Sequence, residues 1–397
     1  MAETAFERDV CVIGGCGHVG LPLAIVLAES GLRVSILDID ERAVELVRRG
    51  RMPFLEEGAD EALARVVAGG DLVVGTSPAL VRDCEFLVLI IGTPVDEHLN
   101  PTFAAIDRAI DACVPHLRRG QTLVLRSTIF PGMTERVQKR LAEAGLEVGV
   151  AFCPERVAQG RSLTEIRQLP QIVSACDAAT LTRVESLFAR FTSERIAMAP
   201  TEAELCKLMT NAWRYLQFAT VNQFYMIASR HGLDFERILH GCRHNYPRMT
   251  GMPGPGFAAG PCLVKDTMQL AAFGHNGFVL GHAAMLVNEG LPAHLIELAR
   301  ERVDLSRCAA GVLGMAFKAE SDDRRDSLSY KLRRLLAMAA RRVLCTDPYV
   351  NDPELVSLER VLEESDVLFL ATPHREYRAL TIPPEKVVVD PWGVFRR

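Results

Sequence analysis

Short apolar runs alternate with helical patterns through the first two hundred residues. The strand-length runs are VCVIGG (10–15), RVSILD (33–38), FLVLIIG (86–92), TLVLRS (122–127) and VGVAFCP (148–154). Between the first two, HVGLPLAIVLAESG (18–31) predicts a helix ended by Gly31. Because the runs are apolar throughout rather than alternating, they indicate a parallel sheet covered by helices on both faces.

The pattern changes after Pro200. Thr201 followed by Glu204 fits a capping box at a helix start. Neither Gly nor Pro interrupts the chain from there to Gly232, which predicts a helix of about 30 residues and roughly 45 Å. More helical pattern follows at 234–242, 265–273 and 291–303.

A second alternating region begins near residue 308, with strand-like runs at 309–317, 342–348, 365–373 and 386–393. The sequence therefore predicts an α/β protein in which a long-helix all-α connector joins two Rossmann-like doubly wound domains. The expected domains are an α/β domain at 1–198, a helical domain at 199–304 and a second α/β domain at 305–397.

Composition and charge narrow the class of protein. The 397 residues are 49% hydrophobic and 24% charged, with a formal net charge of −5. This balance is typical of a globular protein and predicts no nucleic-acid partner. The apolar runs are too short to span a bilayer, and the opening residues MAETAFERDV lack the features of a secretion signal. We therefore expect a cytoplasmic protein with no membrane partner.

The eleven cysteines form no CxxC pair, and Cys11, Cys84 and Cys345 lie in strand-like apolar runs. They resemble small buried hydrophobes, so we expect neither a disulfide framework nor a metal site. Cys262 differs, because it lies in GPGFAAGPCLVKD (254–266), just before a Lys-Asp pair. Small residues let a backbone approach a ligand closely, and a thiolate needs cationic or dipolar neighbours.

The first strand and helix enclose a glycine-rich loop, Gly15-x-Gly17-x-x-Gly20, and the second strand ends in Asp38. This spacing is typical of dinucleotide binding, with the glycines assigned to the tight turn, the pyrophosphate approach and the helix packing. An acid at the second strand favours NAD over NADP. His18 is interpreted as a spacer, and the alternative is a tight turn that binds no nucleotide. The predicted cofactor-binding residues here are Gly15, Gly17, His18, Val19, Gly20 and Asp38.

Taken together, the motifs resemble the UDP-glucose/GDP-mannose dehydrogenase family of nucleotide-sugar 6-dehydrogenases over nearly the whole chain. The motifs that carry the resemblance are GHVGLP (17–22), GTPVD (92–96), RSTIFPG (126–132), PERVAQG (154–160), ELCKLMTNA (204–212), PGFAAGPCLVKD (255–266), GMAFKAESDDRRDS (314–327), TDP (346–348) and VVDPWG (388–393). The resemblance implies an NAD-dependent four-electron oxidation of the C6 alcohol of a UDP-sugar to a uronate. It also implies that Cys262 carries a thiohemiacetal and then a thioester.

The resemblance implies that the domain at 1–198 binds NAD, that the helical domain at 199–304 serves dimerisation and catalysis, and that the domain at 305–397 binds the nucleotide-sugar. It also assigns roles to individual residues. The implied catalytic residues are Thr128, Glu155, Lys207, Asn211, Cys262 and Asp266. The further implied cofactor contacts are Thr93, Thr128, Lys265 and Arg325. The implied substrate contacts are Glu155, Arg156, Lys207, Asn211, Arg248, Phe257, Gly260, Phe317 and Lys318.

Each role has a plainer alternative. Lys207 and Asn211, four residues apart, also suit a solvated helix surface, and Asp266 also suits the first turn of a helix. Glu155 also suits an ion pair, with Arg156 as one possible partner. The two threonines also suit turns, and the run KAESDDRRD also suits solvent.

Three functions remain open at this point. PERV and NYPR favour a UDP-N-acetylhexosamine over UDP-glucose as substrate, while Ala259, where the family usually has glycine, leaves the sugar undecided. A two-electron NAD-dependent hydroxyacid dehydrogenase is the second function, and a nucleotide-sugar sensor without activity is the third. The apolar positions of the long helix predict a homodimer or higher homo-oligomer. These positions are Leu205, Leu208, Met209, Leu216, Phe218, Val221, Phe224 and Ile227.

Overall fold

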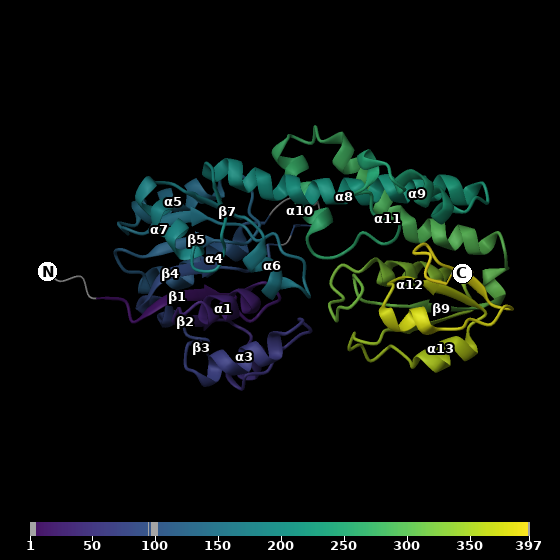
Figure 1. Cartoon of the computed structure of the whole chain (residues 1–397), viewed down its shortest axis with the longest axis horizontal. Coiled ribbons are helices and arrows are strands. Elements are labelled where there is room, and N and C mark those ends of the chain that lie inside the picture. The colour runs from purple at the N-terminus through teal and green to yellow at the C-terminus, as the bar shows by residue number, and fades with distance from the viewer. Residues whose placement is uncertain (1–4, 94, 97–101, 396–397) are drawn as a thin grey trace. The chain divides into compact units, whose positions relative to one another are not determined.

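The computed structural model describes residues 5–93, 95–96 and 102–395 of the chain. The chain divides into two compact units, one up to Met209 and one from Thr210 onward. The boundary falls inside the long helix α8 (Pro200–Arg230). Each unit has its own sheet and its own layers of helices (Figure 1).

The first unit contains an eight-stranded sheet in the order β3-β2-β1-β4-β5-β6-β7-β8. Its strands are β1 (Arg8–Ile13), β2 (Val34–Leu37), β3 (Leu72–Gly75), β4 (Cys84–Leu89), β5 (Thr122–Leu125), β6 (Gly149–Phe152), β7 (Gln171–Ala175) and β8 (Arg195–Ala197). Neighbouring strands are parallel except β6 and β7, which are antiparallel. The predicted strands, which correspond to β1, β2, β4, β5 and β6, do form a parallel sheet. The antiparallel β7 was not among the predicted strands.

Three strands of this sheet, β3, β7 and β8, are not among the predicted ones. β3 and β8 are the two edge strands, and each has side chains exposed to solvent. A strand at an edge does not need the continuous apolar sequence that a central parallel strand needs. β7 begins with Gln171, a polar residue that is buried, and its amide donates to the Pro154 and Ile172 carbonyls.

Helices cover both faces of the sheet. Successive side chains along a strand point to opposite faces, so each strand contributes to two cores. Val10 and Val12 belong to the core under α1, α3, α6 and α7, whereas Cys11 and Ile13 belong to the core under α4 and α5. The helices are α1 (Gly20–Glu29), α2 (Glu41–Arg48), α3 (Ala59–Ala68), α4 (Ala104–Cys113), α5 (Met133–Glu143), α6 (Ser162–Gln168) and α7 (Ala178–Phe188), with short 3₁₀ turns η1 (Pro78–Asp83) and η2 (Val114–His116).

The long helix predicted from the sequence is α8, which has 31 residues. Its predicted capping box is wrong. The helix begins at Pro200, and the Glu202 carboxylate accepts from the backbone N–H of Ala199 at 2.9 Å. Pro is favoured at the first helical position because its missing N–H has no helical partner there. Glu204, assigned to the box, is instead fully buried against α5.

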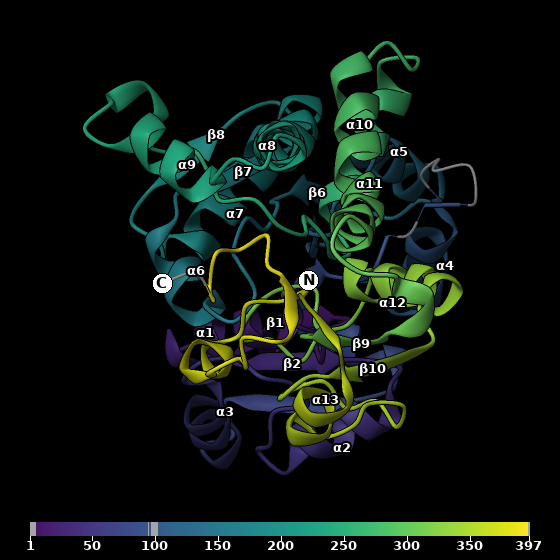
Figure 2. The same ribbon diagram turned by 90° about the vertical axis from the view of Figure 1, so that its right-hand side faces the viewer.

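The second unit combines helices with a four-stranded parallel sheet in the order β10-β9-β11-β12. Its sheet is flanked by α12 and α13 on opposite faces (Figure 2). The strands are β9 (Ala309–Leu313), β10 (Arg342–Thr346), β11 (Val367–Leu370) and β12 (Val387–Val389). The helices and 3₁₀ turns after α8 are α9 (Phe235–Arg243), η3 (Pro247–Met249), α10 (Leu263–Phe273), α11 (Val279–Arg300), η4 (Leu305–Arg307), α12 (Leu328–Ala339), α13 (Leu358–Glu364) and η5 (Arg375–Ala379).

The predicted α/β class with Rossmann-type parallel sheets is confirmed. One helix is longer than predicted: α11 begins at Val279 rather than at residue 291, and Pro292 lies inside it. Pro and Gly are normally read as helix breakers, so Gly290 and Pro292 hid the first half of the helix. The three-domain boundaries remain a prediction. Every helix among the described residues is too short or too polar to cross a membrane.

Candidate active site

The loop between β1 and α1 has the shape that a dinucleotide phosphate needs. Gly17 is exposed, and a Cβ added there would meet nothing closer than 3.9 Å, so its backbone is open to a ligand. A Cβ on Gly20 would lie 2.7 Å from the Gly15 Cα, so this glycine is required for helix–strand packing. The turn assignment needs correction: Gly14, not Gly15, adopts the left-handed conformation, with φ 76°.

Asp38 and His18 connect this loop to neighbouring segments of the first unit. One carboxylate oxygen of Asp38 accepts from the Cys16 N–H at 2.8 Å, and the other accepts from Asp40 N–H at 3.1 Å. A half-buried carboxylate so placed fits an NAD ribose and repels a 2′-phosphate. The ring of His18 stacks on Phe54 with centroids 4.0 Å apart. His18 is therefore more than the spacer predicted, because its ring packs the loop against the segment before α3.

The ends of β4 and β5 bring together two of the predicted cofactor residues. Thr93 donates through its hydroxyl to the carbonyl of Thr128 at 2.8 Å, and Ser127 accepts from the Ile91 N–H at 2.7 Å. β1, β4 and β5 are neighbours in the sheet. The glycine loop and both threonines therefore follow the carboxyl ends of adjacent parallel strands, where doubly wound sheets bind their ligands.

Glu155 forms an ion pair, and its partner is not its neighbour Arg156. The almost fully buried guanidinium of Arg126 pairs with one Glu155 oxygen, while the other accepts from the N–H groups of Arg156 and Val157. The Arg156 side chain donates instead to the Pro170 carbonyl. These contacts support the ion-pair alternative for Glu155, and the predicted roles of Glu155 and Arg156 stay predictions.

Lys207 lies on α8 and is mostly buried. One turn earlier on the same helix, Glu204 accepts from the N–H groups of Gly132 and Thr134, at 2.6 and 2.9 Å. Glu204 thus supplies the N-cap acceptor that Gly132 lacks at the start of α5. Burial raises the pKa of Glu204, against the lowering effect of these hydrogen bonds.

In the second unit, Cys262 is the N-cap residue of α10 and is exposed. Hydrogen bonds to Asp323 raise the pKa of Arg325, and the nearby Cys262 sulfur adds to that shift. The Gly260 N–H donates to the Asp326 carbonyl at 3.3 Å, so the segment before Cys262 and the segment of Arg325 lie together, while the Arg325 guanidinium itself pairs with Asp323. A guanidinium and the first turn of a helix are groups that can stabilise a thiolate.

One turn into α10, Asp266 has a fully buried side chain with two partners. Asn211 donates to Oδ2 at 2.6 Å, and the Lys265 ammonium lies 2.8 Å from Oδ1. Within the described part of the chain, Oδ1 accepts no further hydrogen bond. The structure thus joins three predicted residues, Asn211, Lys265 and Asp266, in one buried polar cluster. Lys207 lies four residues before Asn211 and therefore on the same side of α8.

The small residues before Cys262 have a packing reason of their own. A Cβ on Gly260, which has φ 101°, would come within 2.5 Å of the Phe317 ring. A Cβ on Gly256 would come within 2.4 Å of the Trp392 ring. Phe257 is buried, so it packs inside the unit. The prediction that small residues admit a ligand therefore needs an addition: two of them accommodate the protein's own aromatic rings.

Of the remaining predicted substrate residues, Phe317 and Lys318 are half-buried and Arg248 is exposed. Lys318 lies over the Phe317 ring, with its ammonium 6.0 Å from the centroid. Arg248, on η3, is exposed and lies over Tyr246. The charged run that follows Lys318 is not simply solvated, because Asp323 is buried and paired with Arg325.

Sequence reasoning missed several residues that shape these sites: Gly14, Arg126, Glu204 as an anchor of α5, Asp347 and His374. Asp347 was visible in the TDP motif, but nothing in that motif assigned it a partner. Arg126 opens the RSTIFPG motif, yet its pairing with Glu155 depends on β5 and β6 lying side by side.

Comparisons with known proteins agree with this geometry. Sequence models of the UDP-glucose/GDP-mannose dehydrogenase family match residues 8–192 as the NAD binding domain, 201–289 as the central domain and 311–397 as the UDP binding domain. The UDP-N-acetyl-D-mannosamine dehydrogenase of Pyrococcus horikoshii is 30% identical over 378 residues, which cover 92% of this chain and 90% of that protein. The NDP-N-acetyl-D-galactosaminuronic acid dehydrogenase of Ralstonia nicotianae is 27% identical, covering 98% and 96%.

Solved structures are similar over the same length. The UDP-D-ManNAc dehydrogenase from Pyrococcus horikoshii has a TM-score of 0.91 at 27% identity, covering 98% of this chain and 96% of that one. A UDP-glucose dehydrogenase from the hyperthermophilic archaeon Pyrobaculum islandicum has a TM-score of 0.89 at 27% identity, with the same coverage.

The fold, the dinucleotide loop and these matches define an NAD-dependent oxidoreductase of the nucleotide-sugar dehydrogenase class. The chain belongs to the UDP-glucose/GDP-mannose dehydrogenase family. The resemblance read from the motifs is therefore confirmed, together with NAD as the cofactor.

Proposed function

We propose that the chain catalyses the four-electron oxidation of the C6 alcohol of a UDP-sugar to a uronate, with Cys262 as the covalent nucleophile. The observation that carries the proposal is the exposure of Cys262 at the start of α10, beside Arg325. Cys153 and Cys345 differ from it because they are buried in the core, and burial raises the pKa of each thiol to about 12.

The cofactor fits the residues present. The open backbone at Gly17, the close packing at Gly20 and the carboxylate of Asp38 would hold the pyrophosphate and ribose of NAD. When bound, NAD accepts one hydride in each of the two oxidations.

The chain's own residues supply the rest of the chemistry. The C6 alcohol first gives up a hydride and its hydroxyl proton and becomes the aldehyde. The Cys262 sulfur then adds to the aldehyde carbon: a C–S bond forms as the C=O π bond opens, and the thiol proton passes to the oxygen, which gives the thiohemiacetal. Loss of a hydride and that proton from the thiohemiacetal leaves a thioester on sulfur. We assign to the mostly buried Lys207 the stabilisation of the oxyanion that forms in either oxidation.

Water then cleaves the C–S bond, which yields the carboxylate and returns the thiol. Asp266 is our candidate for activating that water, because its Oδ1 keeps an acceptor site in a buried cluster. Asn211 and Lys265 hold the carboxylate in place. Splitting the conversion through a covalent adduct also keeps a reactive aldehyde from escaping.

A UDP-N-acetylhexosamine is our proposed substrate, and UDP-glucose is the alternative. The relatives named for UDP-N-acetyl-D-mannosamine and for an NDP-N-acetyl-D-galactosaminuronic acid support the first, as do PERV and NYPR. We further propose that the enzyme works in the cytoplasm as a homodimer or larger homo-oligomer, since Met209, Trp213 and Ile227 of α8 are exposed apolar residues.

The test is the stoichiometry of NADH across a panel of UDP-sugars, with the product analysed for a new carboxylate. Our proposal predicts two NADH for each sugar consumed and the highest kcat/KM for an N-acetylhexosamine. One NADH per sugar with a ketone or aldehyde product would instead support a two-electron hydroxyacid-type dehydrogenase. Binding of UDP-sugars without any NADH would support a sensor.

A further inference from the structure

The loop between β9 and α12, residues 314–327, carries Phe317, Lys318 and Arg325. Three of its residues adopt the left-handed conformation: Gly314 with φ 91°, Glu320 with φ 57° and Asp326 with φ 50°. Glycine tolerates this conformation, but glutamate and aspartate are strained in it. The loop therefore needs specific contacts that hold it, above all at Glu320.

Asp347, just after β10, holds the first part of the loop. Its side chain is fully buried, and its Oδ2 accepts from the N–H groups of Met315 and Ala316 at 2.6 and 2.9 Å. Its Oδ1 accepts from the N–H groups of Tyr349 and Val350. Burial by itself raises the pKa of Asp347, but these donors and His374 outweigh it, so the pKa lies below the ordinary value.

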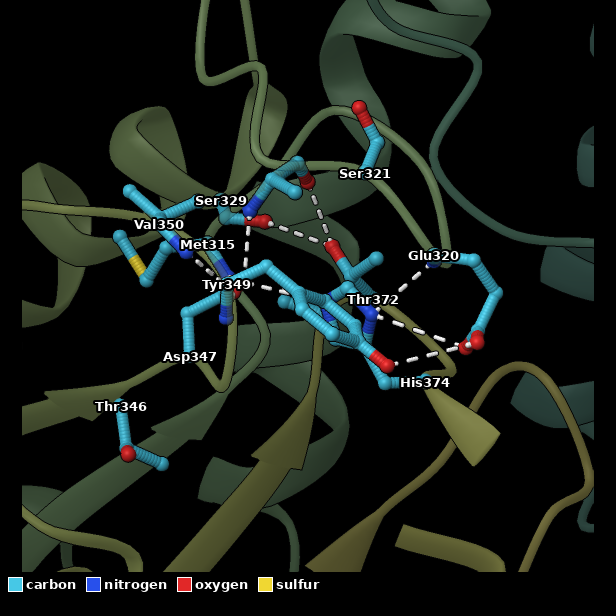
Figure 3. Close-up of polar contacts among 12 residues, drawn as sticks. Met315, Glu320, Ser321, Ser329, Thr346, Asp347, Tyr349, Val350, Thr372 and His374 are labelled. Atoms are coloured by element: carbon cyan, nitrogen blue, oxygen red, sulfur yellow. Dashed lines mark hydrogen bonds and ion pairs between the residues drawn. The ribbon is translucent and has the colours of Figure 1, made fainter. Parts of the chain in front are cut away.

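His374, which follows β11, joins Asp347 to Glu320 (Figure 3). Its ring is fully buried, with Nε2 at 3.0 Å from Asp347 Oδ2 and Nδ1 at 3.1 Å from the Glu320 N–H. A backbone N–H can only donate, so Nδ1 is the nitrogen without a proton, and Nε2–H donates to the carboxylate. The rings of Tyr349 and Tyr377 lie edge-on to the imidazole, at 5.1 and 5.6 Å.

Thr372 closes the same network on the other side of the loop. The Thr372 hydroxyl donates to the Ala316 carbonyl at 2.6 Å. A Cβ added to Gly314 would lie 2.5 Å from the Thr372 Cβ. The segment after β11 thus contacts the loop at two places, at Ala316 through Thr372 and at Glu320 through His374. Phe317 and Lys318 lie between these two anchors.

We propose that the buried His374 positions this loop for the nucleotide part of the substrate, with its hydrogen bond from the Glu320 N–H as the decisive contact. His374 is a positioning residue, since it acts through the loop backbone and not on the reacting atoms. The inference rests on the proposed function to the extent that the loop carries the nucleotide-sugar contacts.

Two substitutions separate the two hydrogen bonds of His374, one with Glu320 and one with Asp347. In His374→Asn the amide reaches the place of Nδ1, so an acceptor for the Glu320 N–H is kept and the donor to Asp347 is lost. In His374→Gln the amide reaches the place of Nε2, so the donor is kept and the acceptor is lost. His294→Gln is the matched control, because His294 is the buried histidine of α11, bonded to Ser229 within the same unit.

Calorimetry with UDP and, separately, NAD measures the effect. His374→Gln should weaken UDP binding about tenfold, the scale of one lost hydrogen bond, whereas His374→Asn and His294→Gln should stay within about threefold. NAD affinity should not change in any of them. With a UDP-sugar, the KM of His374→Gln should rise by the same factor while kcat stays within about twofold.

Hydrogen exchange of the Glu320 amide provides a readout that does not depend on activity. The amide should exchange faster in His374→Gln, and in Thr372→Val the loop should lose protection at its Ala316 end. Unchanged exchange in His374→Gln, an equal loss of UDP and NAD affinity, or a wild type without affinity for UDP would each overturn the inference. If no UDP-sugar yields NADH, the proposed function fails, while UDP binding and amide exchange still decide this one.

Discussion

Replacing Asp266 with asparagine removes a buried negative charge while keeping the size and shape of the side chain. The Lys265 ammonium, 2.8 Å from Oδ1 and itself largely buried, loses its counter-charge. Asn211 keeps an oxygen to donate to, because the new amide still offers one acceptor. The change therefore isolates the charge of Asp266 from its packing.

The expected cost follows from that geometry. Breaking a buried ion pair by removing one partner costs about 3–5 kcal/mol, and the lower end applies because the Asn211 contact survives. A loss of about 3 kcal/mol corresponds to a fall in Tm of roughly 6–12 °C for a unit of this size. Glu297→Gln is the control: Glu297 pairs with Arg300 on the surface, and breaking an exposed pair costs about 1 kcal/mol or less.

The kinetic consequence separates hydrolysis from oxidation. If Asp266 activates the water, Asp266→Asn should release two NADH per active site in a rapid burst and then turn over at least ~10²-fold more slowly. Intact-protein mass spectrometry should find the uronyl thioester on Cys262. A steady state without a burst, or a Tm equal to that of Glu297→Gln, would refute the reasoning about this carboxylate.

Three further predictions concern the loop, a buried acid and the long helix. Gly17→Ala should fold normally, since the added Cβ would meet no protein atom closer than 3.9 Å. Its NAD affinity, measured by calorimetry, should fall about tenfold or more, and an unchanged affinity would contradict the cofactor site. Burial raises the pKa of Glu204 above 4.5, so the ionised folded state is penalised, and stability should fall as pH rises from 4.5 through the folded pKa. The Tm of Glu204→Gln relative to wild type should therefore rise from pH 4 to pH 7, and a constant difference would contradict that sign. Light scattering at micromolar concentration should give at least a dimer, weakened by Ile227→Arg on the exposed apolar side of α8; a monomer mass for the wild type would contradict the oligomer.

The strands that are easiest to predict from the sequence are those with both faces buried. β1, β4, β5, β9 and β11 are central strands, so each has a continuous apolar run that is easy to recognise. The edge strands β3 (LVVG) and β8 (RIA) are short runs with exposed side chains, which makes them harder to recognise. The antiparallel pairing of β6 and β7 depends on the direction of a connection, which apolar periodicity does not encode.

The candidate site divides in a similar way. The spacing of the glycines pointed to the phosphate loop, and the family resemblance carried by local motifs pointed to Cys262, Asp266 and Asn211 as candidates. Contacts between distant segments were not visible. Arg126 meets Glu155 only because β5 and β6 are paired, and His374 meets Asp347 across 27 residues because both follow strands of one sheet.

Glu204 shows how a correct spacing can predict the wrong contact. Its position three residues after Thr201 fits a capping box, but Pro200 sets the helix start and Glu202 takes the capping role. That leaves Glu204 free to face α5, whose N-terminal N–H groups it satisfies.

The central claim is that Cys262 forms a covalent bond to the substrate carbon, and turnover of Cys262→Ser tests it most directly. A hydroxyl is a poor nucleophile at neutral pH, so steady-state NADH production should fall by ~10⁴-fold or more, while NAD and UDP-sugar binding stay near wild type. Cys308→Ser, at a partly buried cysteine of the same unit, should retain full activity. A folded Cys262→Ser protein that produces NADH at the wild-type rate would contradict the account.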